Sequence, residues 1–281
     1  MTERSYIRIE RHGAVGHLVM DRPDRFNSMD VPMAQDLRSA GLKLARDPSV
    51  RAVVFRGTGG KAFCAGADLK YIRAGGVRDE LDYLAPPARP ATEGFGDIFK
   101  QILEYLHSTI SEIRRSPKPW VAAVDGVAAA GGLGLAMCCD LVVCSERSSF
   151  EWAYAKSALC GAESSTFFLP RLVGLRRAMG MALLNPRLDA RTALAWGLVN
   201  EVYPVDRFDA EVAALADRLA ALPTRSVAMT KALMNQSAGV DRLDWHLDQE
   251  LENLKRSADS VDFAEGIEAF FGRRPPAFQG K

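Results

Sequence analysis

The chain has 281 residues, a formal net charge of +1 and a hydrophobic fraction of 48%. This length suffices for one large domain, and the near-neutral charge gives no indication of a nucleic-acid surface or of attraction to an anionic membrane. The polar first residues predict no signal peptide, and no apolar run is long enough to span a bilayer. Five cysteines form no C-x-x-C pair, so we expect reduced thiols in the cytoplasm and neither a disulfide framework nor a metal site.

Predicted strands and helices alternate along the first half of the chain. Residues 6–23 show the polar and apolar alternation of strands, interrupted by glycines. Asp30, two residues before a proline, predicts the start of a helix. Short apolar runs predict three buried strands, at residues 50–60, 120–126 and 140–146. Helix-like segments separate them, and this alternation indicates an α/β architecture with parallel strands.

Two later segments interrupt that pattern. Residues 73–97 are rich in proline, glycine and alanine and predict a long surface loop, either a lid or a simple insertion. From about Asp206 onward the pattern is helical, with two apolar faces that the main domain or another subunit has to cover. We therefore expect a core over residues 1–205 and a helical oligomerisation region over residues 206–281.

Two glycine-rich segments share one design, "KAFCAGADLK" at residues 61–70 and "DGVAAAGGLGLAM" at residues 125–137. Each carries small residues from a predicted strand into a predicted helix, and Asp68 is a candidate N-cap. Free N–H groups at helix starts bind anions or developing oxyanions, so two of them aimed at one point would polarise a thioester carbonyl and stabilise its enolate. Tight packing alone is the alternative explanation.

Other nucleotide and nucleophile motifs are missing from the sequence. The segment "GGLGLA" does not complete G-x-G-x-x-G, because Met137 stands where the third glycine belongs. The sequence contains neither G-x-x-x-x-G-K-[ST] nor G-x-S-x-G, which argues against a phosphate loop and against an ordinary serine hydrolase.

Several blocks follow one another in a specific order: "MDRPDRFNSMD", "KAFCAGADLK", "SPKPWVAAVDG", "AAAGGLGLAMCCDLVV" and the long segment beginning "FFLPRLVG". Over nearly its whole length the chain resembles the enoyl-CoA hydratase/isomerase, or crotonase, superfamily. The resemblance implies a crotonase-type spiral of ββα units with a helical C-terminal trimerisation region. It also implies a homotrimer or a dimer of trimers, and an acyl-CoA thioester as substrate, so that coenzyme A is part of the substrate and not a separate cofactor.

The same resemblance assigns binding roles to single residues. Ala67 and Gly131 match the two backbone N–H donors of the oxyanion hole. The coenzyme would lie against the first turn, at Ala65, Asp68 and Leu69. Arg25 follows the place of a family lysine that meets the phosphates, and Arg273 matches a lysine that reaches the 3′-phosphate of a neighbouring subunit's coenzyme. Both arginines are equally well explained as surface charges.

The acid/base positions depart from the family's pattern. The two hydratase glutamates match Gly134 and Tyr154, and the isomerase carboxylate matches Ala162, so none of the three is acidic. Glu163 is adjacent, and Gly161 replaces the usual proline, which would free the backbone φ there and allow a rebuilt turn.

Three explanations follow from this departure. Glu163 acts as the acid/base of an enoyl-CoA isomerase or hydratase; the site runs another CoA-ester reaction, such as hydrolysis or C–C cleavage, with Tyr154, Glu163 or water; or it only binds an acyl-CoA. Against the catalytic roles, Glu163 reads as a solvated loop residue and Tyr154 as a packing aromatic. His107 is expected to face a neighbouring helix, and Cys64 and Cys160 to be buried thiols.

Overall fold

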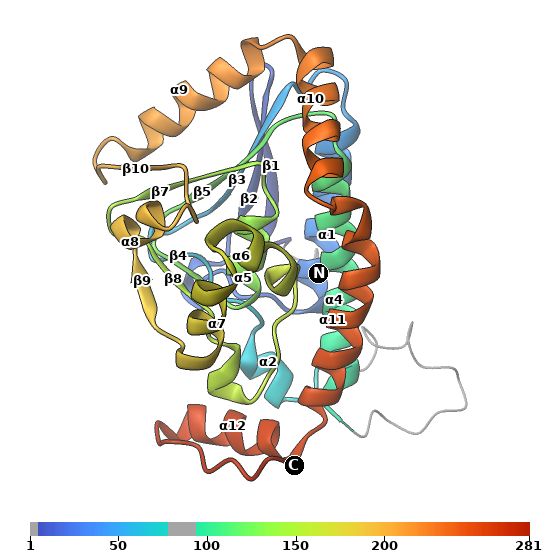
Figure 1. The fold of residues 1–281 in the computed structure, drawn as a ribbon, viewed down its shortest axis with the longest axis vertical. Helices are drawn as coiled ribbons and strands as arrows, with labels where there is room; N and C mark the ends of the chain where they lie inside the picture. The colour runs from blue at the N-terminus through green and yellow to red at the C-terminus, as the bar shows by residue number, and fades with distance from the viewer. Residues whose placement is uncertain (1–4, 78–93) are drawn as a thin grey trace.

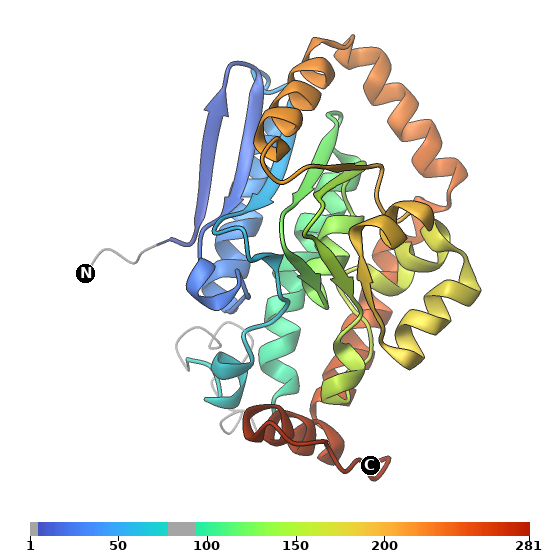
Figure 2. The same cartoon turned by 90° about the vertical axis from the view of Figure 1, so that its left-hand side faces the viewer.

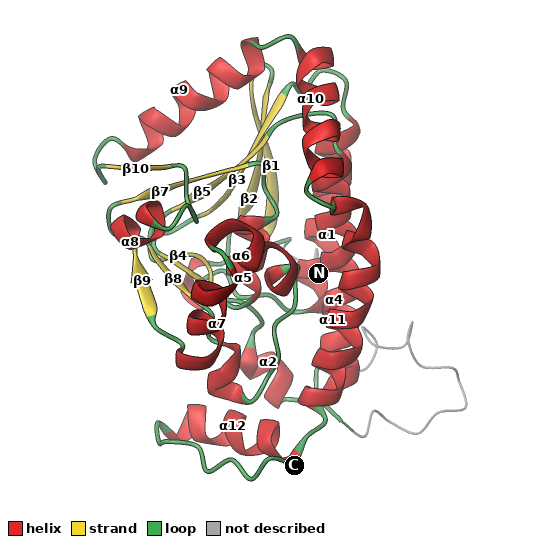
Figure 3. Ribbon diagram, in the orientation of Figure 1, coloured by secondary structure: helices red, strands yellow, loops and turns green. Residues whose placement is uncertain are grey.

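The computed structural model describes residues 5–77 and 94–281, and its strands form two sheets (Figures 1 and 3). The larger sheet has the order β1-β2-β3-β5-β7-β10, antiparallel at β1-β2 and parallel elsewhere. Its strands are β1 (Ile7–His12), β2 (Val15–Met20), β3 (Ala52–Gly57), β5 (Trp120–Val124), β7 (Leu141–Ser145) and β10 (Glu201–Tyr203). The smaller sheet has the order β4-β6-β8-β9, with β4 (Ala62–Cys64), β6 (Val127–Ala129), β8 (Ser149–Glu151) and β9 (Arg187–Asp189).

One unit repeats along the chain. Strands β3, β5 and β7 pair in parallel in the larger sheet, and each is followed by a short strand of the smaller sheet, β4, β6 or β8. A helix closes each unit, and these are α2 (Leu69–Arg73), α5 (Gly131–Met137) and α6 (Ser165–Val173). This repetition confirms the predicted spiral of ββα units.

Both faces of the larger sheet are covered. Val53 and Phe55 lie in the core shared with α1 (Val31–Arg46) and α4 (Gly96–Arg115). Ala52 and Val54 point the other way, into a second core with α9 (Phe208–Ala221), which lies over that face (Figure 2). Side chains alternate across a strand, so burial on both faces explains the continuous apolar runs in the sequence.

The C-terminal helices pack partly on the body of the same chain. α11 (Leu243–Ala258) lies along α4, and the predicted stripe Leu243, Leu247, Leu251 and Leu254 is buried (Figure 1). On α12 (Val261–Gly272) Phe263 is buried, whereas Phe270 is exposed. The remaining helices are α7 (Leu175–Leu184), α8 (Ala190–Ala195) and α10 (Thr224–Ser237), with 3-10 turns η1 (Pro23–Arg25), η2 (Tyr154–Ser157) and η3 (Val240–Arg242).

Local predictions can be compared with these elements. The Asp30 carboxylate caps α1 by accepting from the backbone N–H of Met33 at 3.0 Å, as the sequence predicted. Of the predicted loop 73–97, residues 78–93 lie outside the described residues, and α4 begins at Gly96. No helix in the described ranges is long and apolar enough to cross a membrane.

Candidate active site

The first glycine-rich turn connects β4 to α2. Gly66 has φ +92°, a conformation that favours glycine, and Asp68 caps α2 by accepting from the N–H groups of Lys70 and Tyr71. Met29 fixes the turn from outside, because its N–H donates to Gly66 and its carbonyl accepts from Asp68. Between these bonds the N–H of Ala67 has no hydrogen-bond acceptor among residues 5–77 and 94–281.

The second turn connects β6 to α5. Ala130 has φ +46° and donates its N–H to the carbonyl oxygen of Glu151 at 3.2 Å. The chain then enters α5, whose first N–H, that of Gly131, also lacks an acceptor in the described part of the chain. Such a group carries partial positive charge and suits a developing oxyanion.

The two turns lie against each other, and glycines allow the contact. A Cβ atom on Gly66 would stand 3.3 Å from the backbone nitrogen of Gly131. A Cβ atom on Gly132 would stand 2.0 Å from the carbonyl oxygen of Cys64, at the end of β4. The structure thus brings together the two segments that carry Ala67 and Gly131, although they are far apart in sequence.

Glu163 lies directly over the second turn. A Cβ atom on Gly131 would stand 2.9 Å from both Cδ and Oε1 of Glu163, so the carboxyl group is in contact with this helix start. The side chain is buried, which rules out a solvated loop position. Tyr154 Oη lies 2.5 Å from Glu163 Oε2 and 2.9 Å from the carbonyl oxygen of Ala162.

Among the described residues no cation pairs with this carboxyl group, and its titratable neighbours are Tyr154 and the carboxyl group of Glu250. Burial raises the pKa of Glu163 to about 7, and the hydrogen bond from Tyr154 opposes that rise. Burial and the neighbouring Glu163 raise the pKa of Tyr154 well above its ordinary value, so the tyrosine stays a neutral hydrogen-bond partner. A glutamate with a pKa near 7 can both accept and return a proton at neutral pH.

The turn that carries Glu163 has an unusual backbone. Glu163 and Ser164 both have left-handed φ values, +51° and +64°. Gly161 is required for a different reason from the expected one. Its φ is not left-handed, but a Cβ atom there would stand 2.4 Å from Trp152 and 2.6 Å from Thr166. Glycine at position 161 therefore leaves space for Trp152 and Thr166. The unusual backbone conformation begins two residues later, at Glu163.

Comparisons with known proteins agree with this geometry. A family profile described as enoyl-CoA hydratase/isomerase matches residues 10–86 and 97–281. The chain belongs to the enoyl-CoA hydratase/isomerase family. It is 33% identical to a 1,2-epoxyphenylacetyl-CoA isomerase of Escherichia coli over 94% of both chains, and 35% identical to a putative enoyl-CoA hydratase of Thermus thermophilus over 97% of this chain and all of that one.

Solved structures of this family superpose on the chain. A crystal structure of an enoyl-CoA hydratase from Mycobacterium avium subsp. paratuberculosis gives a TM-score of 0.84 at 32% identity and covers 98% of this chain and 99% of that one. This likeness extends over the spiral and the C-terminal helices. The chain therefore has the family's fold.

Gly134, which the resemblance to the family matched to the first hydratase glutamate, has no space for a side chain. A Cβ atom on Gly134 would stand 2.1 Å from the carbonyl oxygen of Glu163 and 3.0 Å from its Cβ. The backbone of Glu163 therefore occupies the space that a side chain at position 134 would need. Glycine at position 134 is thus required by the placement of Glu163, and a side chain at Gly134 would displace Glu163.

The residues expected to contact coenzyme A fall into two groups. Ala65 and Leu69 are partly exposed on the first turn, and Arg25 is partly exposed at the end of η1. Asp68 is different, because its carboxylate is buried and already used as a helix cap and as a partner of Arg22. Arg273 is exposed after the end of α12, far along the chain from the turns.

Arg22 is a residue that the sequence reasoning missed. Its guanidinium pairs with Asp30 at 2.9 Å and with Asp68 at 3.1 Å, and it donates to the carbonyl oxygen of Ser28. It thereby connects the start of α1 to the first glycine-rich turn. The signal was an arginine directly before Pro23 at a strand end, which does not distinguish a buried clamp from a surface charge.

The other reactive side chains near the site are inert. His107 on α4 faces α11, as predicted, and burial lowers its pKa to about 3. Burial raises the pKa of the Cys64 thiol to about 12 and that of Cys160 to about 11. Cys64 is buried, as predicted, whereas Cys160 is partly exposed, contrary to the prediction, and thiols with such pKa values are poor nucleophiles. In the described ranges no group of three or more His, Cys, Asp or Glu side chains is arranged to hold a metal ion.

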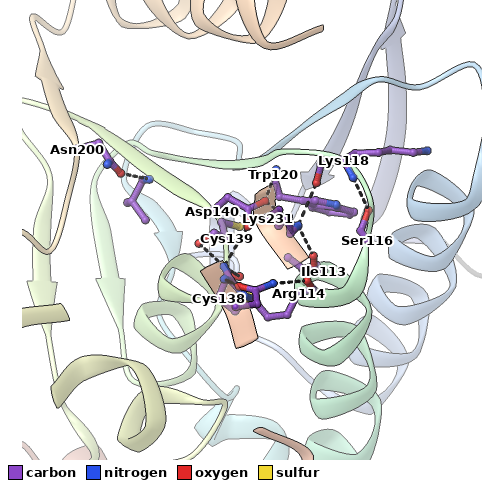
Figure 4. Close-up of polar contacts among 12 residues, drawn as sticks. Ile113, Arg114, Ser116, Lys118, Trp120, Cys138, Cys139, Asp140, Asn200 and Lys231 are labelled. Carbon is purple, nitrogen blue, oxygen red and sulfur yellow. Dashed lines mark hydrogen bonds and ion pairs between the residues drawn. The ribbon is translucent and has the colours of Figure 1, made fainter. Parts of the chain in front are cut away.

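Asp140, which follows the cysteine pair, has a structural role. Figure 4 shows it between two cations: Arg114 at 3.1 Å and Lys231 at 2.8 Å. It also accepts from the N–H of Trp120 at 2.9 Å, at the start of β5. The cluster holds α10, which carries Lys231, against α4 and the sheet.

Proposed function

We propose that this protein catalyses double-bond isomerisation of an enoyl-CoA thioester through an enolate. The observation that carries the proposal is the contact between one buried carboxyl group, that of Glu163, and the start of α5, where Gly131 offers an unpaired N–H. Proton transfer next to a thioester needs a base and donors for the oxyanion. Glu163 would be the base, and the N–H groups of Gly131 and Ala67 would be the donors.

In the proposed reaction the N–H groups of Ala67 and Gly131 bind the thioester oxygen. Glu163 removes a proton from the α-carbon of a 3-enoyl-CoA, and the electron pair is delocalised into a dienolate. The same carboxylic acid then returns the proton to the γ-carbon, which gives the 2-enoyl-CoA. One carboxyl group is sufficient, because the proton that leaves is the proton that is returned.

Isomerisation is favoured over hydration by the chemistry of the two hydratase positions. Gly134 has no side chain, and Tyr154 has a pKa raised well above its ordinary value, so neither supplies a second carboxylate to activate water. The resemblance to a 1,2-epoxyphenylacetyl-CoA isomerase is in line with this choice. The alternatives to isomerisation are another CoA-ester reaction and the binding of an acyl-CoA without turnover.

The remaining roles extend the same proposal. The coenzyme would lie along Ala65 and Leu69, with Arg25 and Arg273 near its phosphates. The protein would work in the cytoplasm as a homotrimer or a dimer of trimers. Support for self-association comes from large apolar side chains exposed on the helices after residue 205, which are Met229, Leu233, Met234, Trp245 and Phe270. Analytical ultracentrifugation tests the assembly.

The decisive experiment replaces Glu163 with Gln and measures conversion of 3-enoyl-CoA to 2-enoyl-CoA and hydration of 2-enoyl-CoA. We expect a fall in kcat of about 10²–10⁴-fold for isomerisation, the usual contribution of a positioned acid/base. Glu252→Gln, an identical change at an exposed position of α11, serves as the control. Full turnover by the Glu163 variant would remove this residue from the mechanism, and binding without any turnover by the unaltered protein would favour the acyl-CoA-binding alternative.

A further inference from the structure

The turn that carries Glu163 needs support from outside itself. Two successive residues, Glu163 and Ser164, adopt left-handed φ values that non-glycine residues rarely occupy. Ser164 stands at the N-cap position of α6, but its side chain makes no capping hydrogen bond. An isolated chain would leave this conformation, so a tertiary contact has to hold it.

Glu250 on α11 makes that contact. Its Oε2 accepts from the backbone N–H of Ser164 at 2.7 Å, and its Oε1 accepts from the backbone N–H of Thr166 at 3.0 Å. The hydroxyl of Thr166 also donates to Oε1. Both carboxylate oxygens are thus used, one on each side of the start of α6, and the first bonded amide directly follows Glu163.

The groups around Glu250 keep it in place without a permanent cation. His107 Nε2 on α4 lies 3.9 Å from Oε2, and His246 Nε2 on α11 lies 3.7 Å from Oε1. His246 Nε2 is also 2.7 Å from the Thr166 hydroxyl, which gives its only proton to Glu250 and therefore accepts from the histidine. Burial and the neighbouring Glu163 raise the pKa of Glu250, whereas the hydrogen bonds that its carboxylate accepts from Thr166 and Ser164 lower it.

We propose that Glu250 is a positioning residue, whose bidentate hold on Ser164 and Thr166 keeps the Glu163 carboxyl group over the start of α5. This inference rests on the proposed function. It also gives the C-terminal region a part in the site of its own chain, because α11 supplies a residue 86 positions away from the amide that it binds.

Two acceptor oxygens are essential to this role. Glutamine has the size of glutamate but presents one oxygen and one NH₂ group, and the NH₂ group would face a backbone N–H, donor against donor. Glu250→Gln therefore breaks one of the two bonds whichever way its amide is turned. Glu252→Gln makes the same chemical change on the exposed side of α11 and is the matched control.

The test compares Glu250→Gln with Glu252→Gln in 3-enoyl-CoA isomerisation and in hydrogen exchange of the Ser164 and Thr166 amides. We expect kcat of the Glu250 variant to fall at least about tenfold with KM within twofold, because the oxyanion donors and the coenzyme site are untouched. Exchange at the two amides should accelerate at least about tenfold. In the Glu163→Gln background the further loss of kcat should be within twofold, since Glu250 acts through Glu163.

The outcomes separate the two proposals. Equal exchange in the two variants, or a full additional loss of kcat in the Glu163→Gln background, overturns the positioning role. If the unaltered protein turns over no thioester, the proposed function fails, and the exchange comparison still decides whether Glu250 holds the turn. If Glu250→Gln does not fold, Glu250→Asp carries the same comparison, because the shorter acid cannot reach both amides, and unchanged exchange there overturns the inference.

Discussion

Two buried glutamates in neighbouring parts of the molecule have opposite surroundings. Glu151 at the end of β8 and Glu163 before α6 are each 3% exposed. Lys156 and Arg187 pair with Glu151, and Asn185 donates to it as well. Within residues 5–77 and 94–281 the carboxyl group of Glu163 has one hydrogen-bond partner, the hydroxyl of Tyr154.

The partners decide what each carboxyl group can do. Burial alone would raise the pKa of Glu151, but Lys156 and Arg187 hold it below its ordinary value, so this residue stays an anion. Burial raises the pKa of Glu163 to about 7, and no cation of the described segments compensates it. Equal burial thus gives a structural ion pair in one place and a proton carrier in the other, and only the proton carrier suits acid/base chemistry.

The largest effect is expected from Gly134→Ala, which disturbs the Glu163 side of the comparison. The new Cβ would stand 2.1 Å from the carbonyl oxygen of Glu163. We expect the free energy of unfolding to fall by about 2–3 kcal/mol and isomerisation to fall more than about tenfold. Both variants are measured by urea denaturation, with Gly180→Ala on α7 as the control, because a Cβ atom there would have nothing within 4 Å. The control should raise the free energy of unfolding by about 0.5–1 kcal/mol. If the two variants had equal free energies of unfolding, the space at Gly134 would not be closed.

Glu163→Gln should stabilise the protein at pH 8. A folded-state pKa of about 7, above the ordinary 4.5, means that protonation of Glu163 favours the folded state. That contribution is complete below pH 4.5 and is lost as the pH rises through about 7, whereas glutamine does not titrate. We expect the free energy of unfolding of the variant to exceed that of the unaltered protein by about 2 kcal/mol at pH 8 and to equal it at pH 4. Thermal or urea unfolding at the two pH values measures it, and a gain that does not depend on pH would contradict the assignment.

Tyr154→Phe sharpens the comparison by removing the one polar partner of Glu163. The hydrogen bond from Tyr154 lowers the pKa of Glu163, so its loss should shift the acidic limb of the pH–kcat profile upward by about one unit. Turnover at pH 7 should fall several-fold and recover at pH 8.5. Tyr203→Phe, on β10, is the control that should leave the profile in place.

Glu151→Gln is the smallest change and should have the opposite sign to Glu163→Gln. The folded-state pKa of Glu151 is lowered, so its stabilising contribution is present above the ordinary pKa and is lost as the pH falls through the folded-state value. The side chains of Lys156 and Arg187 are more than half exposed, so solvent screens their charges. The variant should therefore lose about 1 kcal/mol of the free energy of unfolding at pH 8. Isomerisation should stay within twofold, and a large loss of turnover would place Glu151 in the chemistry.

Much of the fold was predictable because its signals are local. Apolar runs marked β3, β5 and β7, and acidic caps marked the starts of α1 and α2. The leucine stripe of α11 indicated a buried face, although the sequence did not say that α4 of the same chain would cover most of it. The division at residue 205 and the assembly of subunits stay predictions.

The sequence by itself determined the family, the strand–helix alternation and the two turns that present Ala67 and Gly131, because each of these depends on neighbouring residues. Only the tertiary structure decided that Glu163 is buried against α5, that Gly134 is closed, and that Glu250 reaches Ser164 from α11. On a helix pattern Glu250 is indistinguishable from the solvated Glu252. A carboxyl group's chemistry depends on the atoms that replace its water, and the chain supplies those atoms from positions that no local pattern connects.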